Sequence, residues 1–260
     1  MHFAVALPEF LLAIVLAVVF ALATVRSLML TKGGAAMAAA IGLAVIAGQG
    51  WLWLLPLLLF LGSGVLLGRL NKNARTDAKH GKPRDAMQVF CSGGVYAYVA
   101  LLSPGNAHEP LMSVSICVAN ADTWASEIGM WARWRTWNIL TLRKVEPGLS
   151  GGISLPGLVG GVAGAVFMGT VCGMLMSGMS EGAHYFGVMM VLALPGIAGM
   201  LLDSLLGATL QAKYDDGEGR SDAGLVQVGG VQWMTNDVVN VLSNVAIVAI
   251  VAWIMAHWAG

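Results

Sequence analysis

The feature that most constrains this chain is a pair of acidic residues inside an apolar run. Asp122 and Glu127 continue a hydrophobic segment that begins near Leu111, and the segment contains no basic residue to pair with them. A carboxylate in the middle of a transmembrane helix costs about 2.5–3.5 kcal/mol on insertion scales. Membrane proteins retain such groups where they line a cavity, bind an ion or take part in chemistry. The pair therefore predicts a functional polar site.

Helical spacing places the polar residues of this segment on neighbouring strips of one helix. Asn120, Thr123 and Glu127 fall at positions i, i+3 and i+7, and Asp122 and Ser126 fall at i and i+4 beside them. Together they would form one acidic, hydrated face. The simpler alternative is a helix end that happens to be polar.

Composition identifies the class of protein. The chain of 260 residues is 57% hydrophobic and only 11% charged, whereas an ordinary soluble domain carries about 25% charged residues. We predict an all-α, polytopic transmembrane helical bundle that forms one domain over residues 1–260. The eight apolar segments of the expected spans, about 20 residues each, are 7–25, 34–50, 51–68, 87–102, 111–131, 153–176, 185–207 and 238–257.

Basic residues mark alternate connections between these segments. All 14 Lys and Arg residues lie after the first, third, fifth and seventh segments. By the positive-inside rule, these four connections face the cytoplasm and both termini lie outside. No Lys or Arg precedes the first segment, so we expect a retained span rather than a cleaved signal peptide.

Three further features are read as structural. Glycines between Gly157 and Gly173 recur at four-residue spacing, which lets helices approach closely. The three cysteines lie in apolar runs without a C-x-x-C pair, so we expect packing roles and no disulfide or zinc site. A formal net charge of zero gives no reason to expect a nucleic-acid partner.

Two of the four polar clusters on the basic side are suited to phosphate groups. The loop before the fourth span carries Arg75, Lys79, Lys82 and Arg84 and runs into Gln88; basic side chains bind phosphate oxygens. Its alternative is an ordinary basic loop required by topology. The segment that contains Lys144, Ser150, Gly151 and Gly152 precedes the sixth span, where backbone N–H groups and a helix N-terminus favour anions. Its alternative is a glycine-rich turn with a serine cap.

The other two clusters are acidic. One is the segment from Asn120 to Glu127; the other brackets the last cytoplasmic loop with Asp203, Asn236, Asp237 and Asn240. The latter residues could also form a buried structural hydrogen-bond network. Hard oxygen ligands suit Mg²⁺, which usually binds one or two carboxylates together with substrate phosphates. We therefore expect a phosphoryl-transfer site with a lipid substrate, whose metal ligands come from Asp122, Glu127, Asp203 and Asp237.

Five motifs resemble a known membrane family over about residues 30–257. They are KPRDAMQ at 82–88 followed by the glycines at 93–94, ANADTWASEIG at 119–129, GLSGGIS at 148–154, DSLLGATLQ at 203–211 and NDVVN at 236–240. The chain resembles the family that contains the plant phytyl-phosphate kinase of tocopherol synthesis and many prokaryotic proteins. This family is distantly similar to CTP-using lipid kinases such as dolichol kinase.

The resemblance implies a polyprenyl-phosphate kinase in a prokaryotic cytoplasmic membrane. Its substrates would be an isoprenyl monophosphate of phytyl, geranylgeranyl or farnesyl type and a nucleoside triphosphate, with CTP as the expected donor, and membrane lipids would surround it. It implies catalytic roles with Mg²⁺ for Asn120, Asp122 and Glu127 and a phosphate-binding or catalytic role for Lys82. The sequence departs from the family pattern at Cys91-Ser92 and at Leu149-Ser150.

Two other functions use the same residues. One is a different CTP-consuming lipid enzyme, either a lipid-alcohol kinase or a cytidylyltransferase. The other is an ion-coupled transporter that uses the intramembrane acids. Clustering of the polar groups at one surface argues against transport, because transporters bind their substrates near the bilayer midplane.

Overall fold

The computed structural model describes residues 7–70, 83–102, 108–177, 183–215, 220–221 and 226–258. Within these ranges, each of the eight apolar segments forms an α-helix whose ends agree with the prediction to within a few residues. A short 3-10 helix, η1 (Trp51–Trp53), precedes the third. The helices are α1 (Leu7–Arg26), α2 (Lys32–Gln49), α3 (Leu54–Leu70), α4 (Ala86–Leu102), α5 (Glu109–Ala132), α6 (Leu155–Ser177), α7 (Ala183–Thr209) and α8 (Asn236–Trp258).

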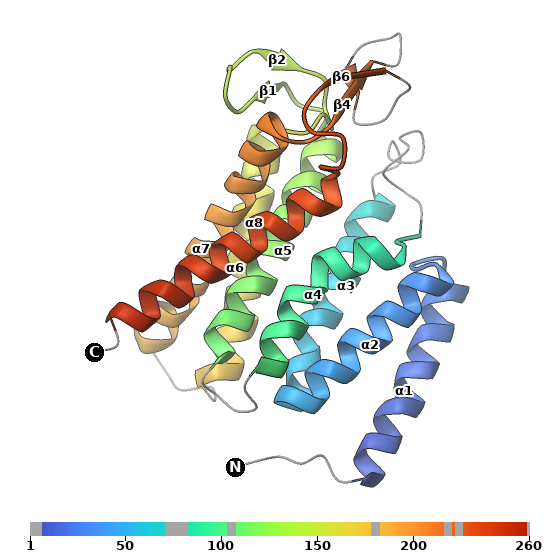
Figure 1. Cartoon of the computed structure of the whole chain (residues 1–260). Coiled ribbons are helices and arrows are strands. Elements are labelled where there is room, and N and C mark those ends of the chain that lie inside the picture. The colour runs from blue at the N-terminus through green and yellow to red at the C-terminus, as the bar shows by residue number, and fades with distance from the viewer. Residues whose placement is uncertain are drawn as a thin grey trace.

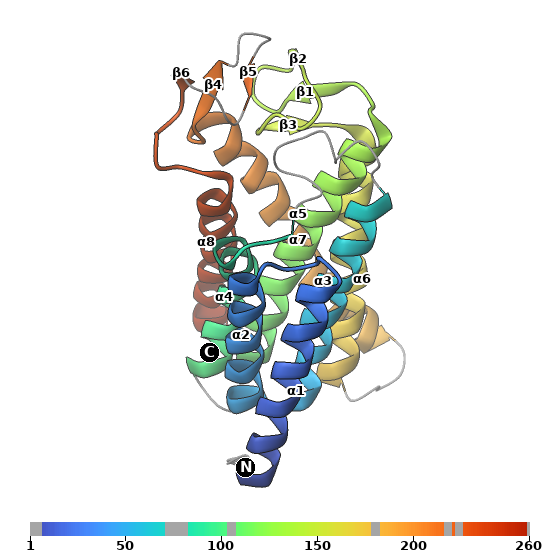
Figure 2. The ribbon, with the colours of Figure 1, turned by 90° about the vertical axis from the view of Figure 1, so that its right-hand side faces the viewer.

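The helices run up and down, so that alternate connections lie at the same end of the bundle. Figures 1 and 2 show the α1–α2, α5–α6 and α7–α8 connections at one end, together with the end of α3 and the start of α4. The start of α1 and the end of α8 lie toward the opposite end (Figure 1). The predicted polar clusters of the α5–α6 and α7–α8 connections therefore lie at the same end of the bundle as the start of α4 (Figures 1 and 2).

Five of the described helices, α2, α3, α6, α7 and α8, are long and apolar enough to cross a membrane, and α1 and α4 contain shorter apolar helices. Large apolar side chains are exposed on the outside of the bundle, such as Leu11, Val15 and Val19 on α1. Such a surface is stable in lipid, where apolar side chains need no protein partner.

Helix α5, which contains the acidic pair, does not meet the same criterion. Its 24 residues nevertheless extend about 36 Å, enough for a hydrocarbon core of about 30 Å. It lies inside the bundle, where it packs against α3, α4, α6, α7 and α8. Its polar groups are therefore surrounded by protein, which is the setting in which intramembrane carboxylates occur.

Close helix packing follows the glycine pattern, as predicted. A Cβ at Gly157 would stand 3.0 Å from the Ala125 carbonyl oxygen of α5, and one at Gly164 would stand 3.1 Å from that of Asn120. Further along α6, a Cβ at Gly169 would stand 3.0 Å from the Met189 carbonyl oxygen of α7. Helix α6 thus contacts α5 and α7 through its glycines.

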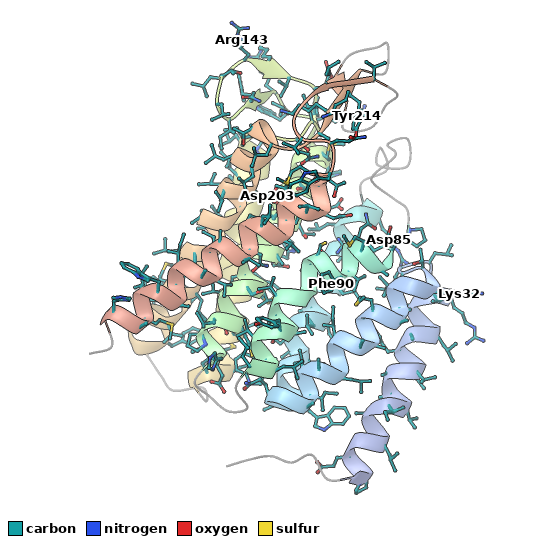
Figure 3. All side chains as sticks on the ribbon, in the orientation of Figure 1. Lys32, Asp85, Phe90, Arg143, Asp203 and Tyr214 are labelled. Carbon is teal, nitrogen blue, oxygen red and sulfur yellow. The ribbon has the colours of Figure 1, made fainter. Side chains whose placement is uncertain are left out.

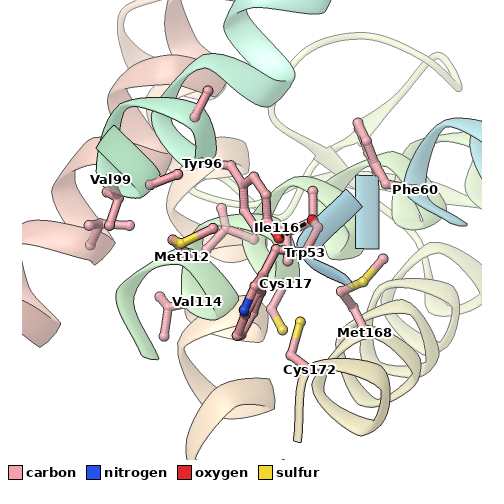
Figure 4. Close-up of a cluster of buried hydrophobic side chains, with 14 of the residues drawn as sticks. Trp53, Phe60, Tyr96, Val99, Met112, Val114, Ile116, Cys117, Met168 and Cys172 are labelled. Atoms are coloured by element: carbon pink, nitrogen blue, oxygen red, sulfur yellow. Dashed lines mark hydrogen bonds between the residues drawn. The ribbon is translucent and has the colours of Figure 1, made fainter. Parts of the chain in front are cut away.

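The largest apolar core is formed by residues of η1 and of α2 to α8, and it includes Cys117 and Cys172. Figure 4 shows the Tyr96 ring in this core, where its hydroxyl donates to the Trp53 carbonyl oxygen at 2.8 Å. Cys91, Cys117 and Cys172 are free and buried. The core holds the membrane-buried part of the bundle together and leaves the end with the polar connections for a site.

Two small sheets differ from the all-α prediction. Between α5 and α6, the antiparallel strands β1 (Thr136–Asn138), β2 (Lys144–Val145) and β3 (Gly152–Ile153) form a sheet in the order β2-β1-β3. Between α7 and α8, β4 (Lys213–Asp215), β5 (Arg220–Ser221) and β6 (Val226–Gly229) form a second, in the order β5-β4-β6. The fold is therefore a helical bundle with two sheets at one end, because these loops satisfy their backbone groups by pairing.

Candidate functional site

A polar cavity of about 690 Å³ lies at the end of the bundle that carries the sheets. Residues of α3 to α8 line it, together with the turn after α1 and the glycine-rich loop before α6. The cavity brings together most of the residues predicted for the site. Those that line it are Arg84, Gln88, Asp122, Thr123, Glu127, Ser150, Gly151, Gly152, Asp203, Asn236, Asp237 and Asn240.

Asp122 and Asp203 connect the helices at the floor of this cavity. Their carboxyl groups are in hydrogen-bond contact between α5 and α7. From α8, the Ser243 hydroxyl donates to Asp203 Oδ1 at 3.2 Å, and the Asn240 amide donates to the same oxygen at 2.9 Å when its nitrogen faces the carboxylate. Figure 3 shows Asp203 toward the sheet end of α7. The predicted acidic clusters of α5, α7 and α8 therefore form one network.

Glu127 adds a further carboxylate to the cavity, in addition to those of Asp122, Asp203 and Asp237. A Cβ at Gly68 would stand 3.5 Å from Glu127 Oε1, so the absence of a side chain there leaves room for the carboxylate beside α3. The other oxygen, Oε2, is buried and has no hydrogen-bond partner among the described residues. A buried acceptor without a partner costs about 1–3 kcal/mol. A bound cation or a ligand N–H or O–H group would remove this cost.

Arg84 is held in the cavity by its own backbone. It pairs with the turn after α1: the Arg84 N–H donates to the Met29 carbonyl oxygen at 3.1 Å, and the Thr31 N–H donates to the Arg84 carbonyl oxygen at 3.0 Å. A Cβ at Gly34 would collide with that carbonyl group, so glycine permits the approach. Sequence reasoning gave no indication of this contact between the α1–α2 turn and the start of α4.

The Arg84 side chain lies beside α3, near the Glu127 carboxylate. Its guanidinium carbon lies 5.8 Å from the centre of the Phe60 ring, and a Cβ at Gly64 would stand 3.0 Å from Nη2. Burial lowers the pKa of Arg84, and the nearby Glu127 carboxylate raises it. Because arginine stays protonated in proteins, the cavity contains a fixed positive charge that faces carboxylates.

The glycine-rich loop before α6 closes the cavity from the side of the sheets. Gly148 and Gly151 have φ angles of +90° and +82°, which glycine adopts without strain. A Cβ at Gly151 would collide with Ala208 of α7. Ser154 caps α6 by accepting from the Gly157 N–H at 3.2 Å. The loop is therefore packed tightly on α7 beside the start of a helix, a position that favours anions.

Asn120 requires a correction, because it does not line the cavity. Its side chain is fully buried; Nδ2 donates to the Gly164 carbonyl oxygen of α6 at 2.8 Å, and Oδ1 accepts from the Ser63 hydroxyl of α3 at 3.4 Å. The Trp124 indole N–H donates to the same serine oxygen at 3.0 Å. Asn120 thus joins α5 to α3 and α6, and its assignment to the reacting centre is revised to a packing role.

Replacement of Asn120 by alanine is therefore expected to destabilise the folded protein by about 1 kcal/mol, since polar contacts between membrane helices contribute about this much. The activity of each folded molecule should be retained. Thermal unfolding in detergent and specific activity of the monodisperse fraction would test both points. A loss of turnover without a loss of stability would restore the catalytic assignment.

Of the remaining predicted basic residues, the structure describes one, Lys144. Lys144 lies on β2 and is exposed, outside the cavity lining, so its assignment to phosphate binding is revised. Arg75, Lys79 and Lys82 lie outside the described residues. Arg69, which was counted only for topology, does line the cavity, and its guanidinium donates to the Ser27 carbonyl oxygen at 2.7 Å.

Several other residues of the cavity were not predicted as members of the site. They include Ser27, Met29, Gly64, Gly68, Thr136 and Tyr214. The four-residue spacing of Gly64 and Gly68 was an available signal, because small residues at this spacing bring helices together. The short turn after α1 and the strand residues Thr136 and Tyr214 carry no comparable signal.

The carboxylates of the cavity do not form a preformed metal cage. In the part of the chain that the structure describes, no three His, Cys, Asp or Glu side chains are grouped closely enough to hold a metal ion. The donor set fits a hard cation that shares one or two carboxylates with a ligand's own oxygens. The unpartnered Glu127 oxygen is consistent with that arrangement.

Apolar helices around a polar cavity define a helical integral membrane protein with a hydrophilic site at one end of its bundle. A family model described as integral membrane protein DUF92 matches residues 15–248. The chain belongs to this family. No solved structure matches the chain significantly.

Proposed function

We propose that this protein is a polyprenyl-phosphate kinase, which transfers a phosphoryl group from a nucleoside triphosphate to an isoprenyl monophosphate. The observation that carries the proposal is the cavity in which Arg84 and the glycine-rich loop face the carboxylates Asp122, Glu127, Asp203 and Asp237. A reaction between two phosphates and a divalent ion requires positive groups and carboxylates within one site. Residues from each of the five motifs that resemble the phytyl-phosphate kinase family line the same cavity.

In the proposed reaction, an oxygen of the prenyl monophosphate attacks the γ-phosphorus of the nucleotide. The new P–O–P bond forms the prenyl diphosphate, and the bond to the β-phosphate oxygen breaks to release the nucleoside diphosphate. Mg²⁺, held by one or two of the carboxylates, would neutralise charge on the transferred group. Arg84 binds and orients phosphate oxygens, and CTP is the expected donor.

The geometry also supports the choice of lipid over a soluble acceptor. The cavity opens at the end of a bundle whose outer surface is apolar, so a phosphate group can enter it while a prenyl tail stays among helices or lipid. Gly64 and Gly68 of α3 and Gly129 of α5 line the cavity, so no side chain projects into it at these positions. A lipid monophosphate fits these surroundings better than a freely soluble substrate.

One assay separates this function from its alternatives. Purified protein with Mg²⁺ and γ-labelled or α-labelled CTP or ATP is given prenyl alcohols and prenyl monophosphates. Transfer of γ-label to a monophosphate supports the proposal, whereas transfer to an alcohol identifies a lipid-alcohol kinase. Transfer of α-label identifies a cytidylyltransferase. No transfer, together with ion-driven solute uptake into proteoliposomes, would replace the enzyme by a transporter.

We further propose that all eight helices span the membrane with both termini outside and the cavity toward the cytoplasm. Two observations support this arrangement. The turn after α1, the α5–α6 connection and the described parts of the α7–α8 connection lie at one end of the bundle, and α5 is enclosed by other helices. Exposed basic residues at that end include Arg133, Arg135, Arg143 and Lys144, and basic residues remain on the cytoplasmic side.

Cysteine labelling in intact cells is expected to separate the two ends of the bundle. A cysteine at Glu109 should react with a membrane-impermeant maleimide from outside, and one at Lys144 should react only after permeabilisation. The three native cysteines are buried, so the unsubstituted protein provides the background. Labelling of both positions from the same side would contradict the eight-span arrangement.

A further inference from the structure

A second, much smaller polar space lies between the helices beside the main cavity. Residues of α4, α5, α7 and α8 enclose about 10 Å³, which is close to the room that one water molecule occupies. Asp122, Asp203 and Asn240 line both spaces, whereas Ser243 and Asn244 line only the small one. We call it the inner compartment. It lies further along α8 than the residues of the main cavity, toward the middle of the bundle.

The inner compartment is rich in oxygen acceptors and has no basic residue in its lining. The carboxyl groups of Asp122 and Asp203 are in hydrogen-bond contact there. The Ser243 hydroxyl donates to Asp203, and the Asn240 amide does so when its nitrogen faces the carboxylate; both donors are neutral. Two carboxylates so close together repel each other unless a proton or a cation is shared between them.

Asn244 provides an independent sign of a ligand. Its side chain is only 2% exposed, and its Nδ2 donates to the Ser115 carbonyl oxygen at 3.0 Å. Its Oδ1 has no hydrogen-bond partner in the described part of the chain. A buried amide oxygen without a partner costs about 1–3 kcal/mol. The cost disappears if the oxygen coordinates a cation.

We propose that the inner compartment binds a single Na⁺ ion, with ligands from Asn244 Oδ1, the carboxylates of Asp122 and Asp203, and the Ser243 hydroxyl. All of these are hard oxygen ligands. Mg²⁺ does not suit the space, because it demands six ligands and usually keeps several waters, for which about 10 Å³ gives no room. A water molecule would also fit the space, but it would bring no positive charge to the acidic pair, whereas Na⁺ would.

Such an ion has a role that differs from that of Mg²⁺ in the main cavity. It neutralises the carboxylate pair from the inner side and fixes α5, α7 and α8 relative to one another. Asp122 and Asp203 then present their outer oxygens to the main cavity. The proposal does not depend on which reaction the main cavity catalyses.

Sodium binding can be measured without nucleotide or lipid. The purified chain in detergent should bind about one ²²Na⁺ with saturation, and NaCl should raise the midpoint of thermal unfolding more than KCl or N-methylglucamine chloride at equal ionic strength. Asn244→Leu keeps the size of the side chain and removes the ligand, so the Na⁺ affinity should fall at least about tenfold, or 1.4 kcal/mol. Ser243→Ala should lower it by a smaller factor.

Ser113→Ala is the matched control. Ser113 is also a fully buried serine of a membrane helix, but its hydroxyl contacts Met176 and not the inner compartment, so its Na⁺ binding should equal that of the wild type. Ser243→Ala decides the matter if Asn244→Leu does not fold. The proposal is overturned if the wild type binds no ²²Na⁺, if K⁺ stabilises equally well, or if both compartment variants bind like the control. Because no substrate is present, none of these results bears on the kinase proposal.

Discussion

Replacement of Asp122 by asparagine is expected to lower kcat for phosphoryl transfer by about 10²–10³-fold, the usual effect of removing one group that stabilises charge in a transition state. The asparagine keeps the shape of the side chain and can still bond to Asp203 across the α5–α7 contact. It removes the charge that would hold Mg²⁺ against the transferred phosphate. The measurement is steady-state turnover of labelled CTP with a prenyl monophosphate over a range of Mg²⁺ concentrations.

Glu127→Gln is expected to show a similar loss, but with little cost in stability. The buried oxygen Oε2 has no partner among the described residues, so the substitution breaks no hydrogen bond at that atom. Asp85→Asn is the matched control for both variants. Asp85 is exposed and accepts from the Gln88 N–H at 3.0 Å at the start of α4, and asparagine caps helices about as well as aspartate. Near-wild-type activity of Asp122→Asn or Glu127→Gln would remove that residue from the metal site.

The helices could be predicted from the sequence because membrane spans depend on local composition. Apolar runs of about 20 residues form helices in lipid, since every backbone group must be bonded within the segment. Even α5 was predicted, because the apolar run that begins near Leu111 continues through its two carboxylates. The two sheets could not be predicted in this way. Strands such as Lys144–Val145 and Gly152–Ile153 are two residues long, too short to show an alternating pattern.

The residues that line the cavity were also partly predictable, because alternate connections of an up-and-down helical bundle lie at the same end. Asp122, Glu127, Asp203 and Asp237 do line one cavity. Asn120 was misplaced, because helical spacing gives the direction of a side chain relative to its own helix but not the identity of the neighbouring helix. It lies opposite Gly164, and its amide nitrogen donates to the carbonyl oxygen of that residue inside the bundle. The contact of Arg84 with the α1–α2 turn joins segments that are far apart in sequence and needed the structure.

Replacement of Arg84 by alanine is expected to reduce kcat/KM by about 10²–10³-fold, through weaker binding of phosphate oxygens and loss of charge stabilisation in the transition state. Its backbone pairs with Met29 and Thr31, so the guanidinium is held before any substrate arrives. Arg84→Lys keeps the charge but loses the two-pronged geometry that matches phosphate, and should fall between the wild type and Arg84→Ala. Initial rates at varied nucleotide and varied prenyl monophosphate would show which substrate Arg84 binds.

Gly64→Ala tests position separately from charge. The added methyl group would stand 3.0 Å from Arg84 Nη2, closer than such atoms normally approach, so the guanidinium must shift while its charge is unchanged. We expect a smaller loss of kcat/KM than in Arg84→Ala. The substrate whose KM changes should be the same one as in Arg84→Lys. Arg143→Ala is the control, because Arg143 is exposed beyond β1 at the far end of the molecule (Figure 3) and outside the cavity lining. If Arg84→Ala behaved like Arg143→Ala, with both substrate dependences unchanged, Arg84 would serve only membrane topology and the phosphates would have to bind elsewhere in the cavity.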